Sequence, residues 1–110
     1  MIRVIFVPVG ERAEVREIES TGEAFTALVG GPFEGWGLLP NVMIICRDDN
    51  RGLFPNRSLP RVGWIFGPFL VVGGADEEGN TMSLPPGLAR ILCDELNRTL
   101  PSPSDPKNVN

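Results

Sequence analysis

The side chains best suited to bind a ligand are four arginines that lie within fifteen residues of one another: Arg47, Arg51, Arg57 and Arg61. A guanidinium group binds phosphate or carboxylate through two parallel hydrogen bonds, so converging arginines could hold an anion. Asn56 lies in the same segment and is included with them. We therefore treat these five residues as a candidate site for a nucleotide-like or other anionic small molecule.

A structural interpretation of the same segment stays open beside the functional one. Arginines are common on protein surfaces, and Asp48 and Asp49 partly cancel the local positive charge. Asn56 follows Pro55 and could form an Asx-type turn that fixes the loop. Sequence alone does not show whether the arginines converge on one site.

Three aromatic residues suggest a second kind of site. Phe54 and Trp64 could stack on a nucleotide base. Trp36 and Trp64 each lie beside glycine, and tryptophan is enriched at interaction hot spots. Trp36, Trp64 and Phe54 are therefore candidate interface residues, although for each tryptophan we expect packing in the core as the commoner role.

Several common chemistries are excluded by residues that the chain lacks. It has no histidine and no tyrosine, and its single lysine is Lys107 near the C-terminus. Without histidine, Ser-His and Cys-His nucleophilic pairs and histidine metal sites cannot form. We therefore predict no catalytic residues, no cofactor and no metal; an enzyme that depends on carboxylates is the third-ranked hypothesis.

Cysteines and an acidic run give two weaker signals. Cys46 and Cys93 lie among apolar residues, so we expect two buried free thiols, with a disulfide between them left open. Asp76, Glu77 and Glu78 could gather around a divalent cation, but such runs are usually solvated turns. We predict a turn.

Length and charge limit the class of protein. A chain of 110 residues suits one domain, here predicted over residues 1–100, with a disordered polar tail over 101–110. The formal charge of −4 gives nonspecific nucleic-acid binding no general support. No apolar run is long enough to cross a membrane, and the N-terminus does not resemble a signal peptide. We predict a cytoplasmic protein.

The first half of the chain alternates between strand and helix patterns. Residues 2–9 and 13–19 predict a β-hairpin, with Pro8 at a strand end. Ser20 and Glu23 fit a capping box that opens a short helix, which the glycines at 30 and 31 end. Residues 32–40 predict a strand with a bulge near Trp36, and residues 42–46 a buried central strand.

The second half is predicted to contain one long strand and one helix. Residues 53–63 carry two prolines and predict an irregular loop, with a short strand at its start left open. Residues 64–74 predict a strand with Gly67 and Pro68 in its middle. A final helix opens at Ser83 or Leu84, and its expected apolar face comprises Leu88, Ile91, Leu92 and Leu96.

These elements predict a single α+β domain. We expect a mostly antiparallel, twisted sheet of five or six short strands with two helices packed against it. Gly and Pro make up 24 of the 110 residues, which favours short elements joined by many turns. An edge strand could pair with a second copy, so a homodimer is an open alternative.

The order of several short motifs resembles an uncharacterised family of small acidic domains of unknown function from phage, plasmid and actinobacterial genomes. The resemblance covers roughly residues 1–98 and departs from the family at Phe54, where members often carry a second proline. The matching features are Val29-Gly30-Gly31 with Glu34, RDDNRGL, Pro55-Asn56-Arg57, IFGPFLVVG, Asp76 with Gly79, and Ser83-Leu84.

The family resemblance implies a phage or mobile-element origin and a setting inside the host cell, but it brings no catalytic residues. Together with the missing catalytic side chains, it favours a small non-enzymatic accessory protein that binds and modulates a host macromolecule, with a host protein as the expected partner. The alternative is a module that sequesters an anion through the Arg47–Arg61 loop.

Overall fold

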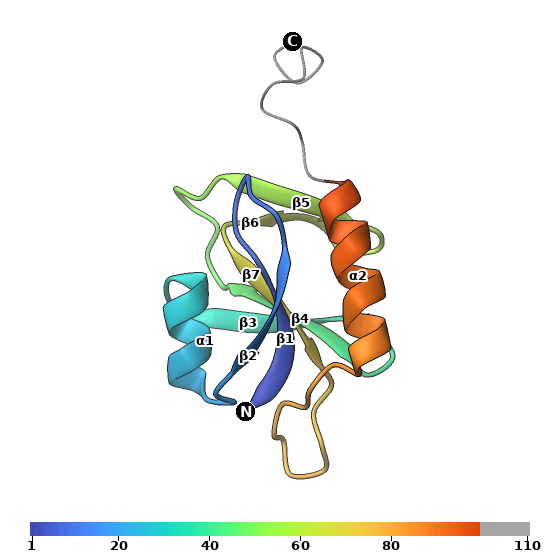
Figure 1. Cartoon of the computed structure of the whole chain (residues 1–110). Coiled ribbons are helices and arrows are strands. Elements are labelled where there is room, and N and C mark those ends of the chain that lie inside the picture. The colour runs from blue at the N-terminus through green and yellow to red at the C-terminus, as the bar shows by residue number, and fades with distance from the viewer. Residues whose placement is uncertain (100–110) are drawn as a thin grey trace.

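Five strands form one antiparallel sheet, and the strand at its centre comes late in the chain. The computed structural model describes residues 1–99, which contain seven strands and two helices (Figure 1). The α+β class and the mostly antiparallel sheet predicted from the sequence are confirmed. The strand order is β2 (Glu14–Ile18), β1 (Ile2–Val7), β7 (Phe69–Gly73), β4 (Val42–Arg47) and β3 (Phe33–Leu39).

The two helices, α1 (Gly22–Val29) and α2 (Pro86–Arg98), lie on opposite sides of this sheet (Figure 1). Successive strand residues point to opposite faces, so the uninterrupted apolar run of β7 supplies both sides of the core. Leu70 and Val72 pack in the cluster beneath α1, whereas Phe69 and Val71 pack in the cluster beneath α2. All four side chains are fully buried.

The first hairpin and the first helix follow the predicted pattern with one shift. β1 pairs antiparallel with β2 and ends at Val7, next to Pro8, which has no N–H for a further ladder bond. The helix cap is Thr21 rather than Ser20, because the Thr21 hydroxyl accepts from the Ala24 backbone N–H. Gly30, with φ of 89°, ends α1 as expected.

The segment predicted as an irregular loop and one long strand has a different structure. It forms a separate hairpin of β5 (Pro55–Leu59) and β6 (Gly63–Phe66), and the chain then enters β7. The break falls at Gly67, whose φ is 77°, and at Pro68, which cannot donate to a ladder. The prediction of a single strand over residues 64–74 was therefore wrong, because these two residues send its halves to different sheets.

The last helix also differs from its prediction. It begins at Pro86 and not at Ser83 or Leu84, with Pro85 as its N-cap. Its buried residues are Ala89, Cys93 and Leu96, while Leu88 and Leu92 are half-buried. Ile91 is 60% exposed and does not belong to the apolar face, because it points away from the i, i+4, i+7 row that faces the sheet.

Both cysteines are free and buried, as predicted. Neither helix within residues 1–99 is long and apolar enough to cross a membrane. The predicted tail over 101–110 lies outside the described residues.

Candidate functional site

Arg57 is a buried structural residue and is not available to an external anion. Its side chain is 1% exposed, and burial lowers the pKa of its guanidinium. Nε donates to the Leu96 carbonyl at 3.0 Å, Nη1 to the Asn56 amide oxygen at 2.6 Å, and Nη2 to the Glu11 carbonyl at 2.8 Å. Arg57 thus ties β5 to the end of α2 and to the β1–β2 turn.

Asn56 completes this buried network. Its side chain is 4% exposed, and its amide nitrogen donates to the carbonyls of Val7 at 3.0 Å and Gly67 at 2.9 Å. These bonds fasten the β5–β6 hairpin to the end of β1. Asn56 and Arg57 are therefore no longer candidates for binding an anion. Asn56 connects segments that are distant in the sequence and does not form a local Asx-type turn.

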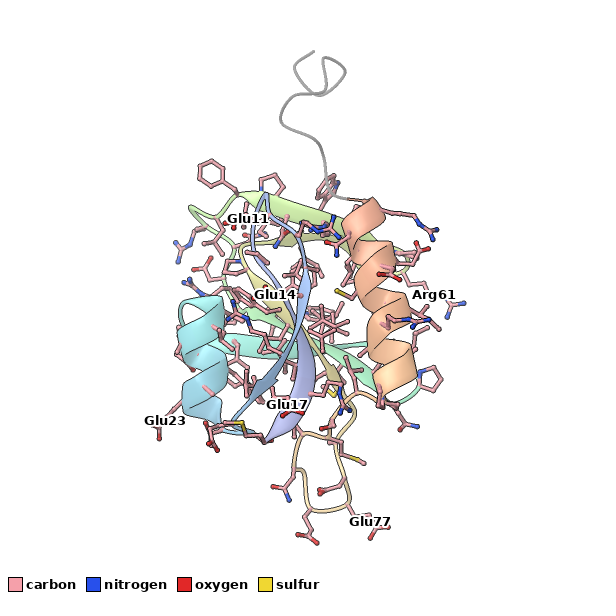
Figure 2. The ribbon with its side chains drawn as sticks, in the orientation of Figure 1. Glu11, Glu14, Glu17, Glu23, Arg61 and Glu77 are labelled. Atoms are coloured by element: carbon pink, nitrogen blue, oxygen red, sulfur yellow. The ribbon has the colours of Figure 1, made fainter. Side chains whose placement is uncertain are left out.

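The other three arginines are directed to separate places. Arg47 donates from Nη1 to the Gly30 carbonyl at 3.0 Å, and its guanidinium packs on the Gly30–Gly31 backbone. Arg51 forms an ion pair with Asp49 at 2.8 Å, and the hydrogen bonds from Arg51 lower the pKa of that carboxyl. Arg61 lies in the β5–β6 turn beside α2 (Figure 2).

A pocket of about 320 Å³ lies on the side of the sheet that carries the β5–β6 hairpin. Its lining residues come from β3, β4, the loop after β4, and β6 with the residue before it. Its volume falls within the range of about 300–1,000 Å³ that is common for ligand sites. The lining residues are Glu34, Trp36, Cys46, Arg47, Asp48, Asp49, Asn50, Val62, Trp64, Ile65 and Phe66.

Both tryptophans line this pocket and remain largely open to solvent. Trp36 is 51% exposed and Trp64 is 59% exposed, so the expectation of core packing was wrong for both. Trp36 projects from the edge strand of the sheet, and its indole N–H donates to the Glu34 carboxylate at 3.0 Å. On β6, Ile65 is buried and Trp64 is exposed.

Phe54 lies next to this site without lining it. It is 76% exposed and directly precedes Pro55, which pairs with Phe66 in the pocket wall. All three candidate interface residues are thus exposed at the surface.

The charge of the pocket is opposite to that of the predicted anion site. The residues that line it include three acidic ones, Glu34, Asp48 and Asp49, and one basic one, Arg47, whose guanidinium lies against Gly30 and Gly31. Arg51 neutralises Asp49, whereas Glu34 and Asp48 have no cationic partner among the ion pairs of residues 1–99. In the sequence, Asp48 and Asp49 were considered only because they partly cancel the charge of the arginines. The spacing of Glu34 and Trp36 at i and i+2 already places both side chains on one face of the strand.

Cys46 at the pocket wall is a protected thiol. Burial, with a smaller contribution from the Glu34 charge, raises the pKa of Cys46 to about 11. The ordinary value is 9.0, so this rise in the pKa should reduce the thiolate fraction at pH 8 by about 100-fold. Cys46 therefore has no activated nucleophile character.

We expect the Cys93→Ser variant, which keeps Cys46 as its one thiol, to react with Ellman's reagent about 100-fold more slowly when native than when unfolded in urea at pH 8. Because the folded pKa is the higher one, the contribution of Cys46 to stability is complete below about pH 9 and is lost as the pH rises toward 11. Comparable native and unfolded rates would contradict the protected thiol.

The acidic run forms a turn. The Asp76 carboxylate accepts from the backbone N–H groups of Glu78 and Asn80, and these bonds, that of Asn80 most strongly, lower its pKa. Glu77 lies at the tip of the loop (Figure 2). Within residues 1–99, no three cysteine or acidic side chains are grouped so that they could hold a metal ion.

A second pocket, of about 540 Å³, lies between the end of β3, the β5–β6 turn and α2. Apolar side chains dominate it, including Leu38, Leu59, Leu92 and Leu96. Arg61 and Glu95 lie at this pocket and not at the first one. Arg61 and Arg47 therefore belong to two different surface features.

The fold and the first pocket define a small α+β domain with an aromatic pocket whose lining contains more acidic than basic residues. The chain belongs to the family described as a domain of unknown function (DUF3846), which matches residues 2–97. No curated protein and no solved structure matches it.

Proposed function

We propose that this chain is a small non-enzymatic accessory protein of a phage or other mobile element, which binds a macromolecule in the host cytoplasm and modulates it. The observation that carries the binding role is the exposure of Trp36 and Trp64 in the walls of one pocket. The part of a large aromatic side chain that stays in water adds nothing to folding, and covering it by a partner is favourable.

Two further observations support binding over catalysis. The thiol of Cys46 is held protonated, and the carboxylate residues Glu34 and Asp48 are exposed at the surface. The genetic origin rests on the family resemblance of the motifs. The alternative of an anion-sequestering module loses support, because Arg57 and Asn56 are buried and the other arginines have separate partners.

Affinity capture from a host extract tests the binding role. We expect the wild-type protein to retain one partner in stoichiometric amount and the Trp36→Ala/Trp64→Ala double variant to lose it. Each hot-spot tryptophan should contribute at least about 2 kcal/mol of binding free energy, or roughly 30-fold in Kd.

Ile91→Ala is the matched control, because Ile91 is an equally exposed apolar side chain on α2 and outside both pockets. This variant should retain the partner. Absence of a stoichiometric partner, or equal retention by the double variant, would contradict the proposal.

A further inference from the structure

The two edges of the sheet differ in how well they are protected from pairing with another chain. β2 carries Glu14, Arg16 and Glu17 within five residues, and charged side chains are a common protection of edge strands. β3 is longer, with seven residues, and Glu34 is its one charged residue. Within residues 1–99, no strand pairs with the outer edge of β3.

The less charged edge, which has one irregularity between Gly37 and Leu39, lies beside the aromatic pocket. Glu34 and Trp36 belong to β3 and also line the pocket. A strand added to β3 would run about 4.8 Å from it, and every second side chain of the added strand would point to the same sheet face as Trp36. A long side chain from such a position could reach between Trp36 and Trp64.

The residues that line the pocket favour a positively charged side chain at this position. Indole faces attract cations, and the unpaired carboxylates of Glu34 and Asp48 would add ionic hydrogen bonds to a guanidinium or ammonium group. A cation–π contact already occurs elsewhere in the molecule, where the Arg16 guanidinium lies 4.5 Å from the centre of the Phe6 ring. An acidic side chain would be repelled by the same carboxylates.

We infer that an extended, basic segment of a partner protein pairs with the free edge of β3 and places an arginine or lysine side chain between Trp36 and Trp64. The inference deepens the proposed function by assigning the partner class and its docking mode, and it rests on that function. Pairing with a second copy is less favoured, because two β3 edges would bring acidic pockets of a chain with net charge −4 together.

The test uses a displayed library of random peptides of about ten residues, long enough to pair with all of β3. We expect selected peptides to be rich in arginine or lysine. Replacing the critical arginine by citrulline, or lysine by norleucine, should weaken binding by at least about tenfold. In a strand that pairs with β3, alternate backbone N–H groups of the peptide point toward β3. Methylation of those nitrogens should abolish binding, and methylation of the other set should not.

Matched protein variants locate the contact. We expect the affinity for the selected peptide to fall by at least about tenfold in two variants, Glu34→Gln/Asp48→Asn and Trp64→Ala. The control Glu23→Gln/Glu77→Gln removes the same number of carboxylates from α1 and the distant loop (Figure 2), and it should leave the affinity unchanged.

Three results would overturn the inference: no selected binder, binders that need no basic residue, or binding that survives both pocket variants. A β3-mediated dimer in light scattering would also overturn it, because the edge would then be occupied. Any of these results, combined with a host partner that still depends on Trp36 and Trp64, would leave the proposed function intact. Failure of the wild-type protein to retain a host partner would reject the proposed function.

Discussion

Replacing Arg57 by alanine is expected to lower the free energy of unfolding by about 3–4 kcal/mol. The substitution leaves the part-buried Glu11 carbonyl and the buried amide oxygen of Asn56 without their donor, and it leaves the Leu96 carbonyl with the Thr99 hydroxyl as its remaining side-chain donor. Each buried acceptor that loses its partner costs about 1–3 kcal/mol. The Leu96 carbonyl also lies at the negative end of α2, where a cation is favourable.

Urea unfolding followed by far-UV circular dichroism measures this loss. Arg57→Lys should recover only part of the stability, because an ammonium group lacks the planar fork that reaches three acceptors at once. Arg90→Ala, an exposed arginine on α2, is the control and should stay within about 0.5 kcal/mol of the wild type. A loss no larger than this control would show that Arg57 is dispensable.

Replacing Gly73 by alanine is expected to destabilise the fold by about 3 kcal/mol or more, because its new methyl group meets backbone on the next segment. An added Cβ would lie 2.6 Å from the carbonyl oxygens of both Met82 and Ser83. These carbonyls cannot rotate away independently, since Gly73 and Met82 share a backbone hydrogen bond of 2.9 Å. The clash should displace the segment that leads into α2.

Gly37→Ala provides the comparison, because Gly37 is also a strand glycine but has nothing within 4 Å of its added Cβ. This variant should be neutral or slightly stabilising, by up to about 1 kcal/mol. Thermal unfolding of the two variants in parallel separates a local clash from a general intolerance of alanine in strands. Equal melting temperatures for the two would refute the close approach at Gly73.

Much of the fold is predictable because local patterns act strongly in the first half of the chain. Alternation in residues 13–19 and the apolar run of residues 42–46 each correspond to a strand. The helix end at Gly30 follows from the conformational freedom of glycine. In these places the local preference and the tertiary packing favour the same structure.

The region around Pro68 was mispredicted because its structure depends on a distant partner. Residues 55–59 have no clean period, yet they form β5 because Asn56 and Arg57 bond to groups contributed by β1, α2 and the turn near Glu11. No short-range pattern reports such bonds. A buried arginine and an exposed arginine look alike in a sequence.

The candidate site was predicted in part. The three aromatic residues were named as interface candidates, and all three are exposed. The arginines were grouped by their proximity in sequence, but the β5–β6 hairpin carries Arg57 inward and Arg61 to another pocket. Chain proximity does not imply a shared site when a tight turn separates two residues.

The central position of β7 has a consequence for synthesis of the chain. The two early hairpins, β1–β2 and β3–β4, pair locally, but each leaves an apolar edge that only β7 covers. Ile5 and Val71 must meet across most of the chain, so loop closure makes this step slow compared with hairpin formation. A nascent chain paused before Phe69 would therefore present two unpaired edges to its neighbours, and aggregation is a greater hazard at that stage than after β7 has emerged.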